Sequence, residues 1–313
     1  MTQLIKRLFG IGSDNVHFQT RGFHLGRSET RQRLEHVGEV FLVGYHTALE
    51  EPEERRLAER LEQVELVNRG FAFEGAAMAL ALRDKLLPGS RRLAALMQGS
   101  GRRHIYMLHI GAGWALARVP WRPQIDRTIQ RFDPLLRWLA VDGYGFHEGY
   151  FHWRAKSPPV PPRGLSRDGL HSFDQGLGRA VWFTECGDVE RITQTVQRFS
   201  ESRHRDLWSG VGLAAAYAGG VSRTDLMQLR SIAARPALAQ GAAFAAKARE
   251  LAGNSAPETE LACEVFCHTS AKVAAQTSDE TLTHLKSLTP NPRYRDWVIG
   301  VEERLTVLSQ SRL

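Results

Sequence analysis

Apolar residues recur every three or four positions along most of the chain, which is the period of an amphipathic helix. The first such stripe begins near Thr30 and comprises Leu34, Val37, Phe41 and Tyr45. Further helical stretches are predicted at residues 51–87, 105–119, 126–153, 188–203, 207–217, 224–233, 236–251, 257–275 and 296–308. No window of the sequence sustains the two-residue alternation that marks a half-buried strand. The pattern therefore predicts an all-α protein.

A glycine followed four positions later by a small or flat residue recurs within this helical pattern. Alanine takes the second position in six of the seven copies, which are Gly44…Ala48, Gly75…Ala79, Gly111…Ala115, Gly149…Trp153, Gly176…Ala180, Gly210…Ala214 and Gly241…Ala245. Successive glycines are 31, 36, 38, 27, 34 and 31 residues apart. Positions i and i+4 share one helix face, so small residues there let neighbouring helices approach closely. We interpret the recurrence as a helical-pair repeat array, either an open α-solenoid or a closed α/α toroid.

The domain organisation follows from where the repeat begins. Residues 1–28 are predicted to form an N-terminal leader segment, and residues 29–313 a single all-α repeat domain. Residues 1–12 combine basic and apolar side chains, so they either form a first helix that docks on the core or rest on a membrane surface. The proline-rich stretch 157–164 is incompatible with a helix. Because the repeat resumes after it, we expect an ordered loop within one array.

Composition and charge exclude several classes of function. The net charge is +7, from 41 lysines and arginines against 34 acidic residues, and arginine is spread over the whole chain. No Lys/Arg-dense block with interleaved aromatic residues stands out, so nucleic acid is not a predicted partner. No run of about 18 apolar residues occurs, so no transmembrane segment is predicted. The odd number of cysteines argues against a disulfide framework and favours a cytoplasmic protein, with peripheral membrane attachment as the alternative.

Polar residues directly precede five of the seven recurrent glycines: Glu74, Glu148, Gln175, Ser209 and Gln240. Equivalent positions in a helical repeat tend to face the same side, so these residues either line one groove or bridge neighbouring helices. Burial would raise the pKa of a glutamate there and suit it to act as an acid. Glu74 and Glu148 are therefore candidate catalytic residues, and Gln175 is a candidate for positioning a substrate.

The densest concentration of titratable and aromatic side chains surrounds His147, which with Glu148 is a candidate acid–base pair. The stretch looks like the metalloprotease motif H-E-x-x-H, but its second histidine, His152, comes one residue too late. We therefore reject a site of the metalloprotease kind. A looser metal site that recruits a distant His109 or His171 is one alternative, and a purely structural segment is another.

His171 and Asp174 lie three positions apart, so the carboxylate of Asp174 either orients the imidazole for catalysis or caps the helix. Aromatic residues gather in the same half of the chain and form either ordinary core or a wall for a long unsaturated hydrocarbon. The candidate substrate-binding residues are Tyr144, Phe146, Tyr150, Phe151, Trp153, Trp114, Gln175, Trp182 and His109. No phosphate-binding loop or dinucleotide glycine motif occurs, so no cofactor is predicted, and metal or haem is the alternative.

Five stretches of the chain are similar to a known family. They are Gly38–Tyr45, Phe73–Leu80, Gly111–Arg118, Asp142–Phe151 and Gln175–Phe183. In this order they resemble the UnbL-like proteins, a domain-of-unknown-function family found beside enediyne polyketide synthases. The resemblance extends over nearly the whole chain, and the linked order of its motifs makes it specific.

The resemblance implies a role in converting a linear polyene from an iterative polyketide synthase into an enediyne core, by maturation, desaturation or cyclisation. It implies a hydrophobic polyene or enediyne precursor as partner, with the synthase or other proteins of the cluster as further candidates. It assigns no catalytic residue. A non-catalytic helical scaffold that binds the synthase, a membrane partner or the polyene is the alternative function, and a homo-oligomer is left open. For an enzyme, we expect the segments near residues 74, 147 and 175 to meet at one cavity.

Overall fold

The computed structural model describes residues 9–310 except positions 52, 88, 119–123 and 153–158. These described residues form helices and no strand, which confirms the predicted all-α class. The longer helices are α3 (Ser28–Glu50), α5 (Arg69–Leu86), α7 (Ile105–Arg118), α9 (Arg137–His152), α10 (Arg167–Thr184), α12 (Glu201–Tyr217), α14 (Arg235–Ala252), α16 (Ala271–Leu288) and α17 (Tyr294–Gln310). The shorter ones are η1 (Ser13–Val16), α2 (Phe18–Arg21), α4 (Glu54–Leu61), α6 (Arg92–Gln98), η2 (Ser100–His104), α8 (Ile125–Ile129), α11 (Val189–Gln197), α13 (Arg223–Ile232) and α15 (Pro257–Cys267). Among them, no helix has the length and apolar character needed to cross a membrane.

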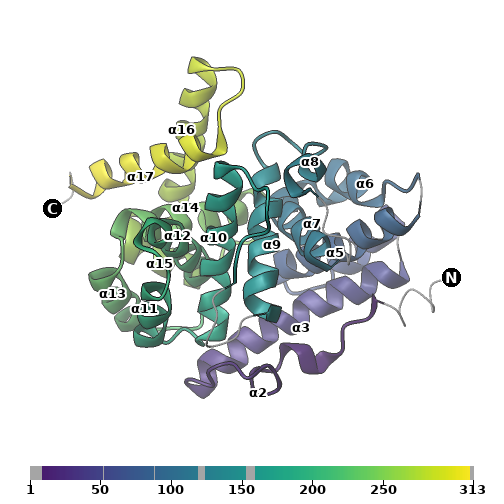
Figure 1. The fold of residues 1–313 in the computed structure, drawn as a ribbon, viewed down its shortest axis with the longest axis horizontal. Coiled ribbons are helices and arrows are strands. Elements are labelled where there is room, and N and C mark those ends of the chain that lie inside the picture. Colours follow the sequence, from purple (N-terminus) through teal and green to yellow (C-terminus); the bar gives the residue numbers. More distant parts are fainter. Residues whose placement is uncertain (1–8, 52, 88, 119–123, 153–158, 311–313) are drawn as a thin grey trace.

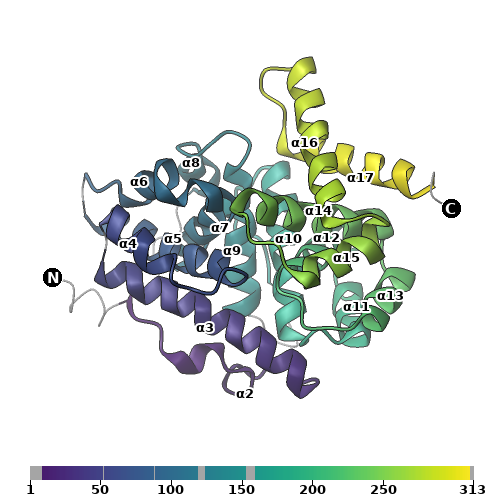
Figure 2. The ribbon, with the colours of Figure 1, turned by 180° about the vertical axis from the view of Figure 1, so that it is seen from behind.

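Seven of the long helices form one continuous array, in which α3, α5, α7, α9, α10, α12 and α14 each pack against the next. Short helices such as α6, α8, α11 and α13 lie at the periphery of this array (Figure 1). Most units of the array therefore consist of one long helix and one short connecting helix, which confirms the predicted helical repeat. Helices α16 and α17 project from one side of the molecule in both views (Figures 1 and 2).

The array closes on itself, as in the toroid alternative, because α3 contacts the chain that follows α12. The hydroxyl of Thr30 donates a hydrogen bond to the carbonyl oxygen of Gly220 at 2.6 Å. One turn further along α3, Nε of Arg33 donates to the carbonyl oxygen of Ala218 at 3.1 Å. These bonds join the first long helix of the array to the sixth.

A buried arginine makes a second closing contact. Arg249 on α14 is 1% exposed, and its Nη1 donates to the carbonyl oxygen of Val67, just before α5, at 2.9 Å. The same guanidinium donates to the carbonyl oxygens of Asn254 at 3.0 Å and Tyr217 at 2.6 Å. Arg249 thus joins α14 to the chain just before α5 and to the end of α12, through hydrogen bonds to backbone carbonyl groups.

The long helices touch through their backbones, because glycine occupies each crossing. A Cβ atom on Gly44 would lie 1.8 Å from the carbonyl oxygen of Ala72, and one on Gly176 would lie 1.9 Å from that of Asp142. Carbonyl contacts between 1.9 and 2.1 Å would also arise at Gly75, Gly111, Gly210 and Gly241. Atoms cannot approach to these distances, so no larger residue fits without separating the helices. The close approach predicted from the small-residue repeat is confirmed.

The repeat predicted from the sequence is out of phase at one helix. On α9 the glycine in contact with the backbone of α7 is Gly143, whose Cβ would lie 2.0 Å from the carbonyl oxygen of Ile110. Gly149, which the sequence pattern selected, faces an alanine side chain of α10 instead. Counted from Gly143, the intervals to Gly111 and Gly176 become 32 and 33 residues in place of 38 and 27. Neither glycine is followed by alanine four positions on, so the spacing used in the sequence could not identify the glycine at this crossing.

The four central helices of the array contact both neighbours through glycines two positions apart. The second glycine of each pair faces the following helix, and these glycines are Gly113, Gly145, Gly178 and Gly212. Their Cβ atoms would lie between 1.9 and 2.3 Å from a carbonyl oxygen of that helix. A Gly-x-Gly pair, with one glycine for each neighbour, is therefore the true signature of the repeat in α7, α9, α10 and α12.

The predicted helical stretch 257–275 is two helices. Helix α15 ends at Cys267, and the next residue, His268, has a left-handed backbone with φ of 54°. The side chain of Ser270 then caps the start of α16 by accepting a hydrogen bond from the backbone of Val273. The apolar period continues across this turn, so periodicity alone could not separate the two helices.

Residues 9–27, here called the N-terminal segment, lie along the outside of α3 and reach the end of α10 (Figure 1). The carbonyl oxygen of Phe9 accepts a hydrogen bond from the hydroxyl of Tyr45 at 2.6 Å. At the other end, the backbone N–H of His24 donates to the carbonyl oxygen of Thr184 at 2.9 Å. The described part of the leader therefore lies against α3 and α10. Most of the stretch 1–12, which was predicted either to dock on the core or to rest on a membrane surface, lies outside the described residues.

We expect Gly176→Ala to lower the free energy of unfolding by about 2–3 kcal/mol, because its methyl group would overlap a carbonyl oxygen of α9. Urea unfolding followed by circular dichroism measures the change. Gly300→Ala in α17 is a matched control, since its Cβ would meet only the side-chain methyl of Thr281, at 2.8 Å. The control should change stability by less than about 1 kcal/mol. Equal stability of the two variants would contradict the importance of backbone contact.

Candidate functional site

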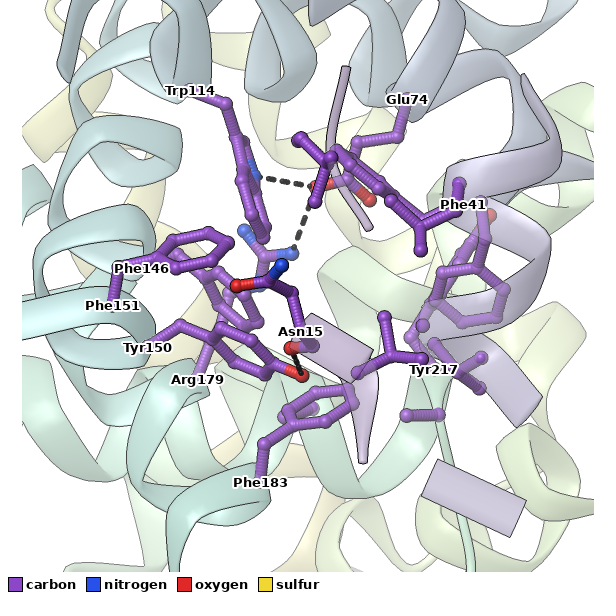
Figure 3. A pocket seen from close by; sticks show the side chains of 18 of the residues that line it. Asn15, Phe41, Glu74, Trp114, Phe146, Tyr150, Phe151, Arg179, Phe183 and Tyr217 are labelled. Atoms are coloured by element: carbon purple, nitrogen blue, oxygen red, sulfur yellow. Dashed lines mark hydrogen bonds and ion pairs between the residues drawn. The ribbon is translucent and has the colours of Figure 1, made fainter. Parts of the chain in front are cut away.

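An apolar cavity of about 50 Å³ lies inside the array, between α3, α5, α7, α9, α10, α12 and the N-terminal segment (Figure 3). Hydrophobic and aromatic side chains form most of its wall. The lining residues are Ile11, Asn15, Val16, Val37, Gly38, Phe41, Leu42, Phe71, Glu74, Trp114, Phe146, Tyr150, Phe151, Arg179, Phe183, Leu213, Ala214, Tyr217 and Ala218. A volume of this size accommodates a few water molecules.

The position of Glu74 in the helical repeat places its polar side chain at the cavity. On α5, Glu74 directly precedes Gly75, the residue at the crossing with α3, and its side chain reaches the cavity. The corresponding residue of α9 is Asp142, which precedes Gly143 and is 1% exposed. Both side chains point to the interior beside a crossing, where the backbone of the neighbouring helix lies against the glycine. The helix geometry thus buries two carboxyl groups.

Trp114 on α7 is the centre of the aromatic wall. Its ring centroid lies 4.6 Å from that of Phe41 and 4.9 Å from that of Phe146. The rings of Phe151 and Tyr150 follow at 5.8 and 6.2 Å. Figure 3 shows these rings surrounding the polar groups of Glu74 and Arg179. Packed rings at these distances form a rigid surface that excludes water.

The polar groups form one buried network. The indole Nε1 of Trp114 donates a hydrogen bond to Oε1 of Glu74 at 3.0 Å, and Nη2 of Arg179 lies 3.7 Å from the same oxygen. Nη1 of Arg179 donates a short hydrogen bond to Oδ1 of Asp142. The guanidinium also lies over the ring of Phe146, 4.8 Å from its centroid. Arg179 therefore bridges the two carboxyl groups and is closer to that of Asp142.

The pKa of Glu74 is strongly raised. Burial raises the pKa of Glu74 to about 7, although the charge of Arg179 and the hydrogen bond from Trp114 oppose the rise. The negative charge of Asp142 adds to it. One guanidinium cannot compensate two carboxylates in a medium of low dielectric constant. The more weakly paired carboxyl group, that of Glu74, therefore holds its proton near neutral pH.

One wall of the cavity is not a long helix. Ile11, Asn15 and Val16 of the N-terminal segment close the side that faces α3 and α9. The segment is held there by Arg21, whose Nη2 donates to the carbonyl oxygen of Tyr150 at 2.6 Å. The guanidinium of Arg21 also packs over the rings of Tyr150 and Phe151. The other walls belong to helices whose backbones are in direct contact.

A family model described as "Protein of unknown function (DUF1702)" matches residues 1–305. The chain belongs to the DUF1702 family. The comparison with curated proteins gave no match, and the comparison with solved structures gave none. Membership of a family of unknown function, which the sequence resemblance implied, is thereby confirmed.

Five of the predicted site residues line the cavity of this DUF1702 protein. They are Glu74, Trp114, Phe146, Tyr150 and Phe151. The segments near residues 74, 147 and 175 do meet there, because α5, α9 and α10 all contribute to the wall. The cavity thus brings one candidate acid together with four candidate substrate-binding aromatic residues.

Two predicted catalytic residues lie beside the cavity without lining it. The ring of His147 packs against that of Trp114, with centroids 5.8 Å apart, on the side away from the cavity. Glu148 is partly buried, and its Oε1 lies 3.6 Å from Nδ1 of His147 and 3.1 Å from Nδ1 of His152. These three side chains form a cluster of their own on α9.

The predicted pair of His171 and Asp174 does not form. Nδ1 of His171 lies 2.7 Å from Oδ2 of Asp206 on α12. The carboxylate of Asp174 instead accepts hydrogen bonds from the guanidinium of Arg203, including one of 2.9 Å from Nε. Positions three apart on a helix can pair, but here each side chain finds an oppositely charged or hydrogen-bonding partner on the neighbouring helix. Asp174 does not line the cavity of the DUF1702 chain.

The other predicted substrate-binding residues lie elsewhere in the packing. Gln175 accepts a hydrogen bond of 3.5 Å from a tyrosine of α17, and Nε1 of Trp182 donates to a carbonyl oxygen after α12 at 3.1 Å. Nδ1 of His109 is hydrogen-bonded to a carbonyl oxygen of its own helix at 2.8 Å. Tyr144 packs against a phenylalanine of α10. Trp153 lies outside the described residues.

Asp142 and Arg179 belong to the buried network but were not among the predicted site residues. The signal for Asp142 was present, because the Gly-x-Gly spacing would have placed Gly143 at the crossing and Asp142 directly before it. Arg179 directly follows the second glycine of the pair on α10, inside an otherwise small and apolar stretch. A lone arginine at such a position is buried next to a crossing and needs an acidic partner.

We expect Glu74→Gln to change how the stability of this protein depends on pH. Because the pKa of Glu74 is raised on folding, the folded protein binds more protons than the unfolded chain between about pH 4.5 and pH 7. Wild-type stability should therefore fall with rising pH over this window through Glu74, by at most roughly 3 kcal/mol. Glutamine keeps the shape and has no proton to lose, so the variant should become the more stable protein toward pH 8.

Urea unfolding at several pH values between 5 and 8 measures this difference. Glu59→Gln, at an exposed position on α4, is the control and should follow the wild-type pH dependence. A difference between Glu74→Gln and wild type that stays constant across the range would show that Glu74 does not titrate there.

Proposed function

We propose that this chain binds a linear polyene and transfers protons to it through Glu74, in the conversion of the polyene toward an enediyne core. One observation carries the proposal. Glu74, a carboxyl group whose pKa is raised to about 7, faces an otherwise apolar and aromatic cavity. A carboxyl group with a pKa near neutrality that is shielded from water is suited to proton transfer. The resemblance to UnbL-like proteins is the reason for choosing a polyene and this pathway.

The aromatic wall suits a conjugated hydrocarbon. The rings of Phe41, Trp114 and Phe146 offer faces and edges against which a flat π system can pack. A strongly polar ligand would need a matching hydrogen-bond partner for each of its buried groups. Apart from Glu74 and Arg179, few polar side chains face the cavity.

The proposed chemistry neither oxidises nor reduces the polyene. Protonated Glu74 gives its proton to one carbon of the polyene, whose π electrons form the new C–H bond and leave a carbocation on the conjugated chain. Aromatic faces such as that of Trp114 stabilise the cation, and Arg179 stabilises the new carboxylate. Glu74 then removes a proton from another carbon, which gives an isomerised polyene. Where the π electrons of a further double bond first attack the cation and form a C–C bond, loss of the proton gives a ring. Desaturation would need an oxidant in addition, and we do not include it.

Ligand entry requires the N-terminal segment to move. The cavity of about 50 Å³ is smaller than the roughly 300–1,000 Å³ typical of small-molecule sites. Successive long helices of the array cannot separate without breaking their backbone contacts. Ile11 and Val16, in contrast, belong to a segment held by side-chain packing and separate hydrogen bonds. Displacement of this segment both opens and enlarges the cavity.

Glu74→Gln tests the catalytic role. In the intact biosynthetic pathway we expect the yield of the cyclised or isomerised product to fall by at least about 100-fold, as for the loss of a general acid. Binding of cis-parinaric acid, a fluorescent conjugated tetraene, should remain close to that of wild type. Fluorescence titration and product analysis give the two readouts.

A buried carboxyl group away from the cavity provides the matched control. Glu302 on α17 is 6% exposed and paired with Arg205, and Glu302→Gln should leave product yield unchanged. A wild-type yield from Glu74→Gln would overturn the catalytic role and favour the non-catalytic scaffold. Failure of the wild-type protein to bind the tetraene would overturn the polyene site itself.

A disulfide between the N-terminal segment and α3 should block ligand entry. A Cβ on Gly38 would lie 2.9 Å from Cβ of Val16, so cysteines at both positions can be joined after a shift of the segment by about 1 Å. We expect the oxidised Val16→Cys/Gly38→Cys protein to bind cis-parinaric acid at least about tenfold more slowly than the reduced form.

Stopped-flow fluorescence before and after reduction measures this rate. Val16→Cys alone is the control, and its association rate should be the same under oxidising and reducing conditions. Equal association rates for the oxidised and reduced double variant would show that the ligand enters by another route.

A further inference from the structure

We propose that His147, Glu148 and His152 form a binding site for a divalent transition-metal ion such as Zn²⁺ on α9. Among the described residues, these three bring one nitrogen or oxygen atom each within 4.8 Å of one another. Two histidines and one glutamate are a ligand set that zinc accepts, with a further position left for water. The proposal does not depend on the reaction proposed for the cavity.

Two of the three ligand separations already suit tetrahedral zinc. Bonds of about 2.0–2.2 Å from zinc to nitrogen and oxygen place neighbouring ligand atoms roughly 3.3–3.5 Å apart. Oε1 of Glu148 lies 3.6 Å from Nδ1 of His147 and 3.1 Å from Nδ1 of His152. The carboxylate is thus between the two imidazoles, and the distance that has to shrink is the one that separates the imidazoles.

His152 can make this adjustment. Its side chain is 58% exposed and lies one helical turn beyond Glu148, so rotation of its ring disturbs little packing. The ring of His147 is held in place by Trp114 and Phe151, with centroid distances of 5.8 and 4.7 Å. One fixed imidazole and one adjustable imidazole allow the site to close around an ion.

A buried nitrogen of His147 lacks a good partner. Nδ1 of His147 is shielded from solvent, and the nearest carboxylate oxygen, at 3.6 Å, is too far for a well-formed hydrogen bond. Buried polar atoms in this condition are uncommon and costly. Coordination of a metal ion would satisfy this nitrogen.

The electrostatics permit binding of moderate strength. Desolvation lowers the pKa of His147, which keeps its imidazole in the neutral form that binds metal. Desolvation raises the pKa of Glu148, but its interactions with the two histidines outweigh this and leave the carboxyl group ionised. Arg118 on α7 is close enough to act on His147, and its charge opposes the cation.

The more distant ligands that the sequence suggested are engaged elsewhere. Nδ1 of His109 is bonded to a carbonyl oxygen of α7 at 2.8 Å. Nδ1 of His171 is paired with Asp206 at 2.7 Å, on the far side of α10 from His147. The site therefore consists of residues from α9 alone, and its histidines lie five positions apart instead of the four of the H-E-x-x-H motif.

Metal binding can be tested on the full-length, tag-free protein after dialysis against a chelator. We expect isothermal titration with Zn²⁺ to give one ion per chain, and Co²⁺ to give the visible absorption bands of a tetrahedral site. His152→Ala removes an exposed ligand without disturbing the core, and it should weaken Zn²⁺ binding by more than about tenfold. Zn²⁺ should raise the unfolding temperature of the wild type and not that of this variant.

His36→Ala is the matched control. His36 and Glu39 form an exposed pair on α3, with Nδ1 and Oε2 3.4 Å apart. Within the part of the chain that the structure describes, no third histidine, cysteine or carboxylate joins this pair to complete a metal site. The control should bind Zn²⁺ as the wild type does. Equal affinities of wild type and His152→Ala, or no stoichiometric binding by the wild type, would overturn the proposal.

Discussion

Direct contact between helix backbones at glycine is the constraint on which the rest of this structure depends. Glycine inside a helix costs about 1 kcal/mol relative to alanine, and this chain accepts that cost at every crossing of the array. The compensation is close packing, with dispersion contacts along the whole crossing and Cα–H···O contacts between neighbouring backbones. Because each central helix is fixed to both neighbours, the interior of the array has little freedom to expand.

The same constraint explains why charged groups are found in the interior. Glu74 and Asp142 each lie next to a crossing glycine and are enclosed there, with exposed fractions of 3% and 1%. Two carboxyl groups with a single guanidinium are an expensive arrangement in a protein core, and apolar residues of similar size would be the more stable choice. The position of this network beside an aromatic cavity is in keeping with the proposed chemical role.

Much of the fold was predictable from the sequence, because amphipathic periodicity and small-residue spacing report directly on helices and their crossings. The phase of the repeat on α9 was predicted wrongly, because the spacing of glycines four positions before a small or flat residue selected Gly149, whereas the Gly-x-Gly pair and the contact with Ile110 belong to Gly143. Glu74 and the aromatic wall were also predicted from local features, namely a polar residue before a recurrent glycine and a concentration of aromatic residues in one half of the chain. The pairing of His171 with Asp206 was not, because it joins two helices whose relative rotation the sequence does not reveal.

The role of the N-terminal segment depends on contacts that are distant along the chain, such as that between Arg21 and Tyr150, and no local pattern predicts these. The buried guanidinium of Arg249 is of the same long-range kind, and it has a consequence for solution conditions. Its partners are neutral carbonyl groups shielded from solvent, so dissolved ions cannot compete for them effectively. Exposed ion pairs such as Arg27 with Asp225 weaken as ionic strength rises. The contacts that close the array should therefore persist in concentrated salt, whereas exposed ion pairs on its surface would weaken.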